Sequence, residues 1–295
     1  MIDPKDFYST FQVNYFDYKQ AYQSYALKNI KEFGLEDKIL DYSEKDFRQA
    51  IKSDIRQTLF QAIETVFDLV YALTKTRRGK YLDVEILRTL SFPTLYYDRI
   101  GKIAKDKLEL DFLDKEVYLE DNISVTLCEY IFYFGAAENQ DFRPKIIESL
   151  GAIKEALYIL AKEFSDRKEY NSYKHGLRIV PALTYFIIQN PTTKKNLGKW
   201  DLSDSMTYYS ENEKSGKMEF ITKVFDTDRD LKLTSLCSNL IWNIIKLRDL
   251  AFNKKKPGEI VSLKVILFTK DIVSEANTIN TSFQNLRLST TVRKT

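Results

Sequence analysis

Residues that break helices are scarce in this chain, which has six prolines and nine glycines among 295 residues. A sandwich or barrel of many short strands needs a turn about every ten residues, and turns depend heavily on Gly and Pro. Hydrophobic residues make up 44% of the chain, which favours a packed core over disorder. The sequence therefore predicts a mainly α protein built from long helices.

Apolar residues recur at helical spacing in several long segments. The longest follows Ser43, whose hydroxyl suits an N-cap, and its apolar stripe consists of Ile51, Ile55, Leu59, Ile63, Val66 and Val70. We expect other helices at 14–33, ended by Gly34, at 144–164 and at 230–253.

The segments between these helices have less regular patterns. Asp83 is expected to cap a helix that Pro93 interrupts or kinks. Dense charge among Leu and Phe at 106–119 fits either a short helix or a connector. With the apolar segment 123–134 included, four or five helices are expected before residue 175.

The pattern changes after Pro181, where β-branched and aromatic residues become frequent. The segment 182–188 fits a strand, although a short helix would have the same composition. Two apolar runs flank the polar residues 211–216, which predicts a hairpin over 206–225. A further strand is expected at 260–268, followed by a cationic tail over the last dozen residues. The predicted fold is a helical bundle with a small antiparallel β excursion in its C-terminal half.

These elements predict three consecutive regions. A helical extension is expected at 1–42, a helical domain at 43–253 with a β insertion at about 182–226, and a strand with a basic tail at 254–295. The first residues lack the pattern of a secretory signal, and no apolar run is long enough to span a membrane. We therefore expect a cytoplasmic protein with no membrane partner and reduced cysteines.

One histidine, His175, and two distant cysteines, Cys128 and Cys237, limit the chemistry of this chain. They are too few for a structural zinc site, and we expect neither a metal nor another cofactor. Magnesium or manganese held by carboxylates is the alternative that 42 Asp and Glu leave open. The fingerprints of P-loop NTPases, dinucleotide-binding proteins and α/β-hydrolases are absent.

His175 belongs to a row of polar residues. If 164–178 is helical at about 100° per residue, then Arg167, Asn171, His175 and Arg178 share one face, and tyrosines occupy the other. An imidazole can act as a general acid or base, and a guanidinium can bind phosphate in a bidentate manner. A solvated helix face with no function is the alternative interpretation.

The order of Arg followed by His on a late helix of a bundle resembles the HEPN domain family. The resemblance implies a metal-independent RNA endonuclease that acts as a homodimer, in a bacterial defence or toxin-type system. The family spaces Arg and His by four to six residues. Here seven separate Arg167 from His175, and Lys168 is the basic residue at the upper limit of that spacing.

The expected function is therefore RNA cleavage by His175, Arg167, Asn171 and Arg178, with Lys174, Arg56 and Glu64 as substrate-binding candidates. Arg56 and Glu64 lie on one face of the 43–73 helix, where an ordinary surface pair is the alternative. The abundant tyrosines offer surfaces on which bases can stack. The alternative function is a non-catalytic interaction or sensor module that binds protein, nucleotide or nucleic acid.

Overall fold

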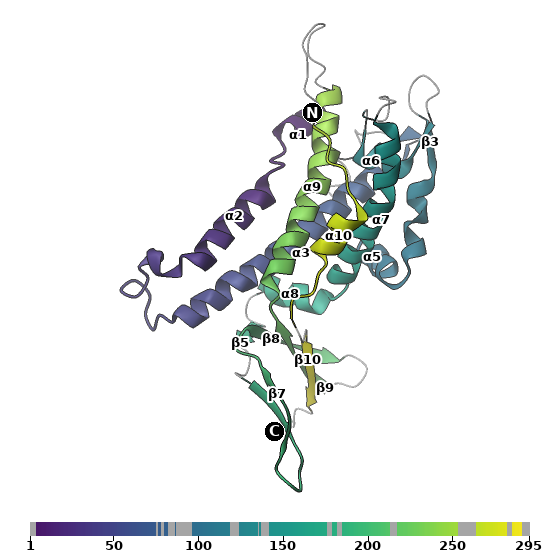
Figure 1. Ribbon diagram of the computed structural model, residues 1–295. Coiled ribbons are helices and arrows are strands. Elements are labelled where there is room, and N and C mark those ends of the chain that lie inside the picture. Colours follow the sequence, from purple (N-terminus) through teal and green to yellow (C-terminus); the bar gives the residue numbers. More distant parts are fainter. Residues whose placement is uncertain are drawn as a thin grey trace. The chain divides into compact units, whose positions relative to one another are not determined.

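The computed structural model describes residues 4–74, 76–77, 80–81, 86, 96–118, 124–134, 136, 142–175, 179–181, 185–212, 217–252, 264–281 and 285–290. These residues form a mainly α protein with small antiparallel sheets, as the scarcity of helix-breaking residues predicts (Figure 1).

The chain divides into two compact units, each built from three stretches of sequence. Unit 1 comprises 1–19, 59–165 and 232–278, and unit 2 comprises 20–58, 166–231 and 279–295. Neither unit coincides with one of the three consecutive regions expected from the sequence, 1–42, 43–253 and 254–295. Three helices, α2 (Tyr15–Lys28), α3 (Glu44–Leu73) and α9 (Thr227–Phe252), contribute residues to both units.

Unit 1 is mainly helical. Besides its parts of α2, α3 and α9, its elements are α1 (Pro4–Thr10), β1 (Thr76–Arg77), β2 (Lys80–Tyr81), α5 (Tyr96–Lys105), η2 (Lys107–Asp114), β3 (Glu116–Tyr118), β4 (Ser124–Thr126), α6 (Leu127–Phe132), α7 (Arg143–Phe164) and α10 (Lys270–Ala276). Helix α7 packs against α5, α6 and α10. Pro144 lies in its first turn, where a proline removes no intrahelical hydrogen bond.

Burial in unit 1 follows the helical periodicity read from the sequence. The buried apolar positions of α3 and α9 in this unit include Leu59, Ile63, Val66, Val70, Leu233, Leu236, Leu240, Ile244 and Leu247. These side chains recur every three or four residues, and residues between them such as Phe60, Phe67 and Ile241 are buried too, so each helix is covered on more than one face. The predicted helices over 43–73 and 230–253 are thereby confirmed.

Unit 2 combines helices with most of the β structure. Besides its parts of α2, α3 and α9, its elements are η1 (Ile30–Phe33), α8 (Arg167–His175), β5 (Ile179–Pro181), β6 (Tyr185–Gln189), β7 (Asn196–Asp201), β8 (Ser205–Asn212), β9 (Lys217–Val224) and β10 (Asn285–Thr290). One antiparallel sheet has the order β10-β9-β8-β5, and β6 pairs with β7 in another. The predicted hairpin is β8–β9, with Ser205 opposite Val224.

Local signals in unit 2 act as the sequence predicts. The Asp46 N–H donates to Ser43 Oγ at 3.3 Å, so Ser43 caps α3. Gly34 ends η1 with a φ of +52°, a conformation that glycine adopts without steric strain. Apolar side chains from α2, η1 and α3 form a core cluster of Ala26, Ile30, Ile51 and Ile55.

Two predictions for the C-terminal part are wrong. Residues 264–268 form no strand, because the Asn243 side chain takes up both backbone groups of Ile266: Nδ2 donates to the carbonyl at 2.7 Å, and Oδ1 accepts from the N–H at 3.1 Å. Residues 285–290 are not a free tail but strand β10, in which Arg287 lies opposite Ile221 of β9.

Three other segments refine the sequence-based assignment. The undecided segment 106–119 contains the 3-10 helix η2 and strand β3. The helix expected over 164–178 is instead a separate short helix, α8, which follows the end of α7 at Phe164. The predicted Asp83 cap and the interruption at Pro93 lie outside the described residues.

Candidate functional site

Helix α8 carries most of the residues predicted to form the site, and unit 2 holds its N-terminus in place. Asp166 precedes the helix, and its Oδ1 accepts a hydrogen bond from the Glu169 N–H at 3.2 Å. The other oxygen of the same carboxylate accepts from the Tyr208 hydroxyl at 2.7 Å. Asp166 therefore caps α8 and ties it to strand β8.

A buried group of charges fixes the inner face of α8. The Glu169 side chain, which has no exposed surface, accepts from Arg56 Nε at 2.8 Å and from Lys223 Nζ at 2.6 Å. Arg56 also donates from Nη1 to Asp230 at 2.8 Å. We call Arg56, Glu169, Lys223 and Asp230 the ion cluster. Its two cations and two carboxylates balance, which satisfies charges that would be costly to bury alone.

Tyrosines complete the buried side of α8. Tyr170 and Tyr173 are both buried, as the sequence predicts for the aromatic face of this helix. Burial, and then the nearby Glu169 charge, raise the pKa of Tyr173 well above its ordinary value. Burial, Glu169 and Asp166 likewise raise the pKa of Tyr208. Both phenols therefore stay neutral at physiological pH and act as packing and hydrogen-bonding groups rather than as bases.

The opposite face of α8 is more accessible. Lys168 and Lys174 are exposed and Asn171 is half-buried, and Lys174 Nζ lies 5.9 Å from the centroid of the Tyr170 ring. At helical periodicity the backbone positions of Arg167 and His175 fall on this same side, with Asn171 between them. Arg178 lies outside the described residues.

The two candidates from α3 have partners other than the predicted ones. Arg56 is buried in the ion cluster, so the alternative of a solvated surface pair does not hold for it. Glu64 accepts a hydrogen bond from the Tyr97 hydroxyl in unit 1. Arg56 is thus a structural residue of unit 2, and its guanidinium is already engaged by two carboxylates.

Sequence reasoning missed the other members of the ion cluster. Glu169 lies four residues before Tyr173, on the buried face of α8. A carboxylate on an otherwise apolar face indicates a buried partner of opposite charge. Nothing in the sequence around Lys223 indicates a buried partner. Its contact with Glu169 depends on how strand β9 is placed in the sheet. In the sequence, Asp230 resembles the acidic residues that commonly occur in the first turn of a helix, here α9.

No metal-binding group is apparent in the described part of the chain, where no three His, Cys, Asp or Glu side chains are arranged to hold an ion. Cys128 and Cys237 are buried, as expected from their apolar surroundings. Burial raises the pKa of the Cys128 thiol to about 12 and also raises that of Cys237. Neither thiol is poised to act as a nucleophile.

Comparisons with protein-family models, curated proteins and solved structures found no match. The resemblance to the HEPN family therefore rests on the motif residues alone. Within the described residues, no helix is both long enough and apolar enough to span a bilayer.

Proposed function

We propose that this chain is an RNA-binding protein whose α8 face forms a metal-independent ribonuclease site. In this proposal His175 is the acid or base, Arg167 and Arg178 hold the scissile phosphate, Asn171 orients it and Lys174 contacts the flanking backbone. The observation that carries the proposal is the difference between the buried and the accessible face of α8. Its inner face is fixed by the ion cluster, and its outer face presents lysines and an amide.

The chemistry requires a second proton-transfer group. Attack by a 2′-hydroxyl on the adjacent phosphate needs a base to remove one proton and an acid to protonate the leaving oxygen. Each chain has a single histidine. A homodimer that pairs two α8 faces would supply both groups, so we include dimerisation in the proposal.

Helix α2 offers a further feature that suits RNA. Four of its tyrosines are exposed, and they lie three or four residues apart: Tyr15, Tyr18, Tyr22 and Tyr25. In unit 2, Tyr22 is 62% exposed and Tyr25 is 55% exposed. Exposed aromatic rings bind unpaired bases by stacking, with little dependence on sequence. The implied place in a cytoplasmic bacterial defence or toxin-type system follows from the HEPN resemblance alone.

The direct test is cleavage of mixed single-stranded RNA in EDTA by the wild-type protein and by His175→Ala. We expect wild type to cleave and His175→Ala to lose at least about 100-fold in rate while it still binds RNA. Lys105→Ala, an exposed change on α5, is the matched control and should cleave normally. Equal cleavage by His175→Ala and wild type would overturn the catalytic assignment.

The second candidate is the RNA-binding form of the non-catalytic module, whose expected partners are protein, nucleotide or nucleic acid. It is favoured by the engagement of Arg56 in the ion cluster, which removes one cation from the set expected to contact substrate. This candidate predicts that wild type binds RNA without cleaving it, and that Lys174→Ala and Tyr22→Ala each weaken binding. Absence of RNA binding by the wild-type protein would reject both candidates.

A further inference from the structure

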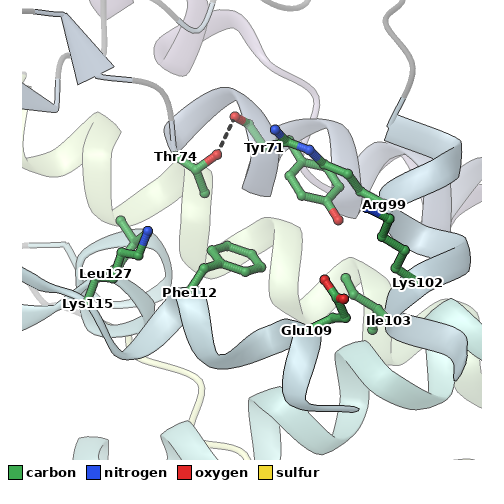
Figure 2. A pocket seen from close by; sticks show the side chains of 9 residues that line it. All are labelled: Tyr71, Thr74, Arg99, Lys102, Ile103, Glu109, Phe112, Lys115 and Leu127. Carbon is green, nitrogen blue, oxygen red and sulfur yellow. Dashed lines mark hydrogen bonds between the residues drawn. The ribbon is translucent and has the colours of Figure 1, made fainter. Parts of the chain in front are cut away.

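Unit 1 contains a pocket separate from the α8 site. It has a volume of about 340 Å³ and is lined by α3 and the residue after it, by α5, by η2 and the residue after it, and by the start of α6. Figure 2 shows its lining residues: Tyr71, Thr74, Arg99, Lys102, Ile103, Glu109, Phe112, Lys115 and Leu127. This volume falls within the range of small-molecule sites.

The charges around this pocket are unbalanced. Arg99, Lys102 and Lys115 are exposed cations, and Glu109 is the one acidic residue of the lining. None of the three cations forms an ion pair within the part of the chain that the structure describes. Their surplus of two positive charges matches the two negative charges of a phosphate monoester near neutral pH.

Aromatic rings form one side of the pocket. The Tyr71 ring stacks on Tyr96 with centroids 4.8 Å apart and lies nearly parallel to the Phe112 ring at 6.2 Å. The Arg99 guanidinium lies 5.6 Å from the centroid of the Tyr71 ring. A planar group entering the pocket would therefore meet an aromatic surface next to cations.

Among the described residues the Tyr71 hydroxyl has no hydrogen-bond partner, although Tyr71 is only 2% exposed. It points toward the space framed by Phe112, Glu109 and Arg99 (Figure 2). Burial raises the pKa of Tyr71 above its ordinary value, so the hydroxyl remains a proton donor at neutral pH. Buried polar groups are rarely left without a partner, so this hydroxyl is available to donate to a water molecule or a ligand in the pocket.

We propose that this pocket binds a mononucleotide, a phosphate monoester that carries a planar base. Arg99 and Lys102 would hold the phosphate and Phe112 would contact the base. Lys115, which lies beside Leu127 on the other side of Phe112 (Figure 2), would add to the positive charge around the ligand. The Tyr71 hydroxyl would donate to an acceptor atom of the ligand, while the Glu109 carboxylate would accept from an amino or hydroxyl group. The proposal does not depend on RNA cleavage at α8, and it assigns unit 1 a separate binding role.

The test is isothermal titration calorimetry of the full chain with AMP, GMP, CMP and UMP. Adenosine and ribose 5-phosphate are titrated as well, to separate the contributions of base and phosphate. We expect at least one mononucleotide to bind more tightly than either fragment. We also expect its affinity to fall as salt is raised, because the cations are exposed and therefore screened.

Variants of the lining test the assignment residue by residue. Arg99→Ala should weaken binding about 10- to 100-fold, the usual effect of losing a charged hydrogen bond to phosphate. Tyr71→Phe should weaken it about 5- to 10-fold without loss of stability, because the hydroxyl has no hydrogen-bond partner in the described part of the protein. Lys105→Ala, on the same helix as Arg99 but outside the pocket, should change affinity less than about 2-fold.

Each outcome supports or overturns the proposal. Failure of all four mononucleotides to bind at millimolar concentration would overturn it, as would equal binding by wild type, Arg99→Ala and Tyr71→Phe. Ribose 5-phosphate binding as tightly as every mononucleotide would overturn the role of Phe112 in holding a base. The His175→Ala variant should bind mononucleotides normally, so failure of the ribonuclease proposal and failure of this one are distinguishable.

Discussion

The ion cluster of unit 2 and the pocket of unit 1 use charge in opposite ways. In the cluster, Glu169 is fully buried and accepts hydrogen bonds from both Arg56 and Lys223. Around the pocket, Arg99, Lys102 and Lys115 are exposed and form no ion pairs within the described residues. A charge that is buried and paired holds elements of the fold together, whereas one left unpaired beside an unsatisfied hydroxyl is available to a ligand.

The largest effect expected from this comparison is on the ion cluster. Glu169→Gln should lower the free energy of unfolding by about 3 to 5 kcal/mol, because it removes the carboxylate shared by the buried Arg56 and the partly exposed Lys223. Urea unfolding monitored by circular dichroism measures this loss. Glu36→Gln, an exposed change in the same unit, is the control and should alter stability by less than about 0.5 kcal/mol. Equal changes in the free energy of unfolding for Glu169→Gln and Glu36→Gln would show that the ion cluster does not stabilise the fold.

Asp68 of unit 1 contrasts with Glu169, whose carboxylate is buried in ion pairs. Asp68 is half-buried on α3 without an ion pair among the described residues, and burial, with a smaller contribution from Glu64, raises its pKa to about 6. The folded state therefore holds a proton that the unfolded state releases between about pH 4 and pH 6. Above pH 6 both states are ionised, and the cost of burying the charge is fully present.

Asp68→Asn should therefore stabilise the protein at pH 8 by about 1 to 2 kcal/mol, a value reduced from the full shift because solvent reaches this side chain. The gain should disappear at pH 4. Unfolding curves at the two pH values test this, with the exposed Asp98→Asn as control. A gain that is equal at pH 4 and pH 8 would show that ionisation of Asp68 is not its source.

The smallest effect on stability is expected at the pocket. Arg99→Ala should change the free energy of unfolding by less than about 0.5 kcal/mol, because its guanidinium is exposed and makes no ion pair with any described residue. The same urea unfolding experiment measures it beside Glu169→Gln. A loss above about 2 kcal/mol would mean that Arg99 supports the fold, and the contrast between the two regions would fail.

Much of the helical framework could be predicted because it depends on local signals. Ser43 as a cap, Gly34 as a helix end and the apolar stripe from Ile51 to Val70 each act through neighbouring residues. Strand β10 was missed because its partner, β9, lies more than sixty residues away in sequence. Of the strand predicted at 260–268, the described part 264–268 is not a strand, because the Asn243 side chain on α9 bonds both backbone groups of Ile266.

The candidate site was predictable only in part for the same reason. The polar and aromatic faces of α8 follow from helical spacing, and the burial of Tyr170 and Tyr173 agrees with it. The ion cluster joins α3, α8, β9 and α9, so no single segment reveals it. The pocket likewise depends on residues from α3, α5 and η2, and each of its cations resembles an ordinary surface charge in the sequence.

The contrast between paired and unpaired charges is tested most directly by thermal unfolding of wild type, Glu169→Gln and Arg99→Ala. Each is measured with and without the mononucleotide that binds wild type most tightly. A ligand that binds only the folded state raises the unfolding temperature. We predict that Glu169→Gln unfolds at a lower temperature than wild type but is still stabilised by this mononucleotide. Arg99→Ala should unfold at the wild-type temperature and lose the response to the mononucleotide. Loss of stability in Arg99→Ala, with its response to the mononucleotide retained, would contradict the account.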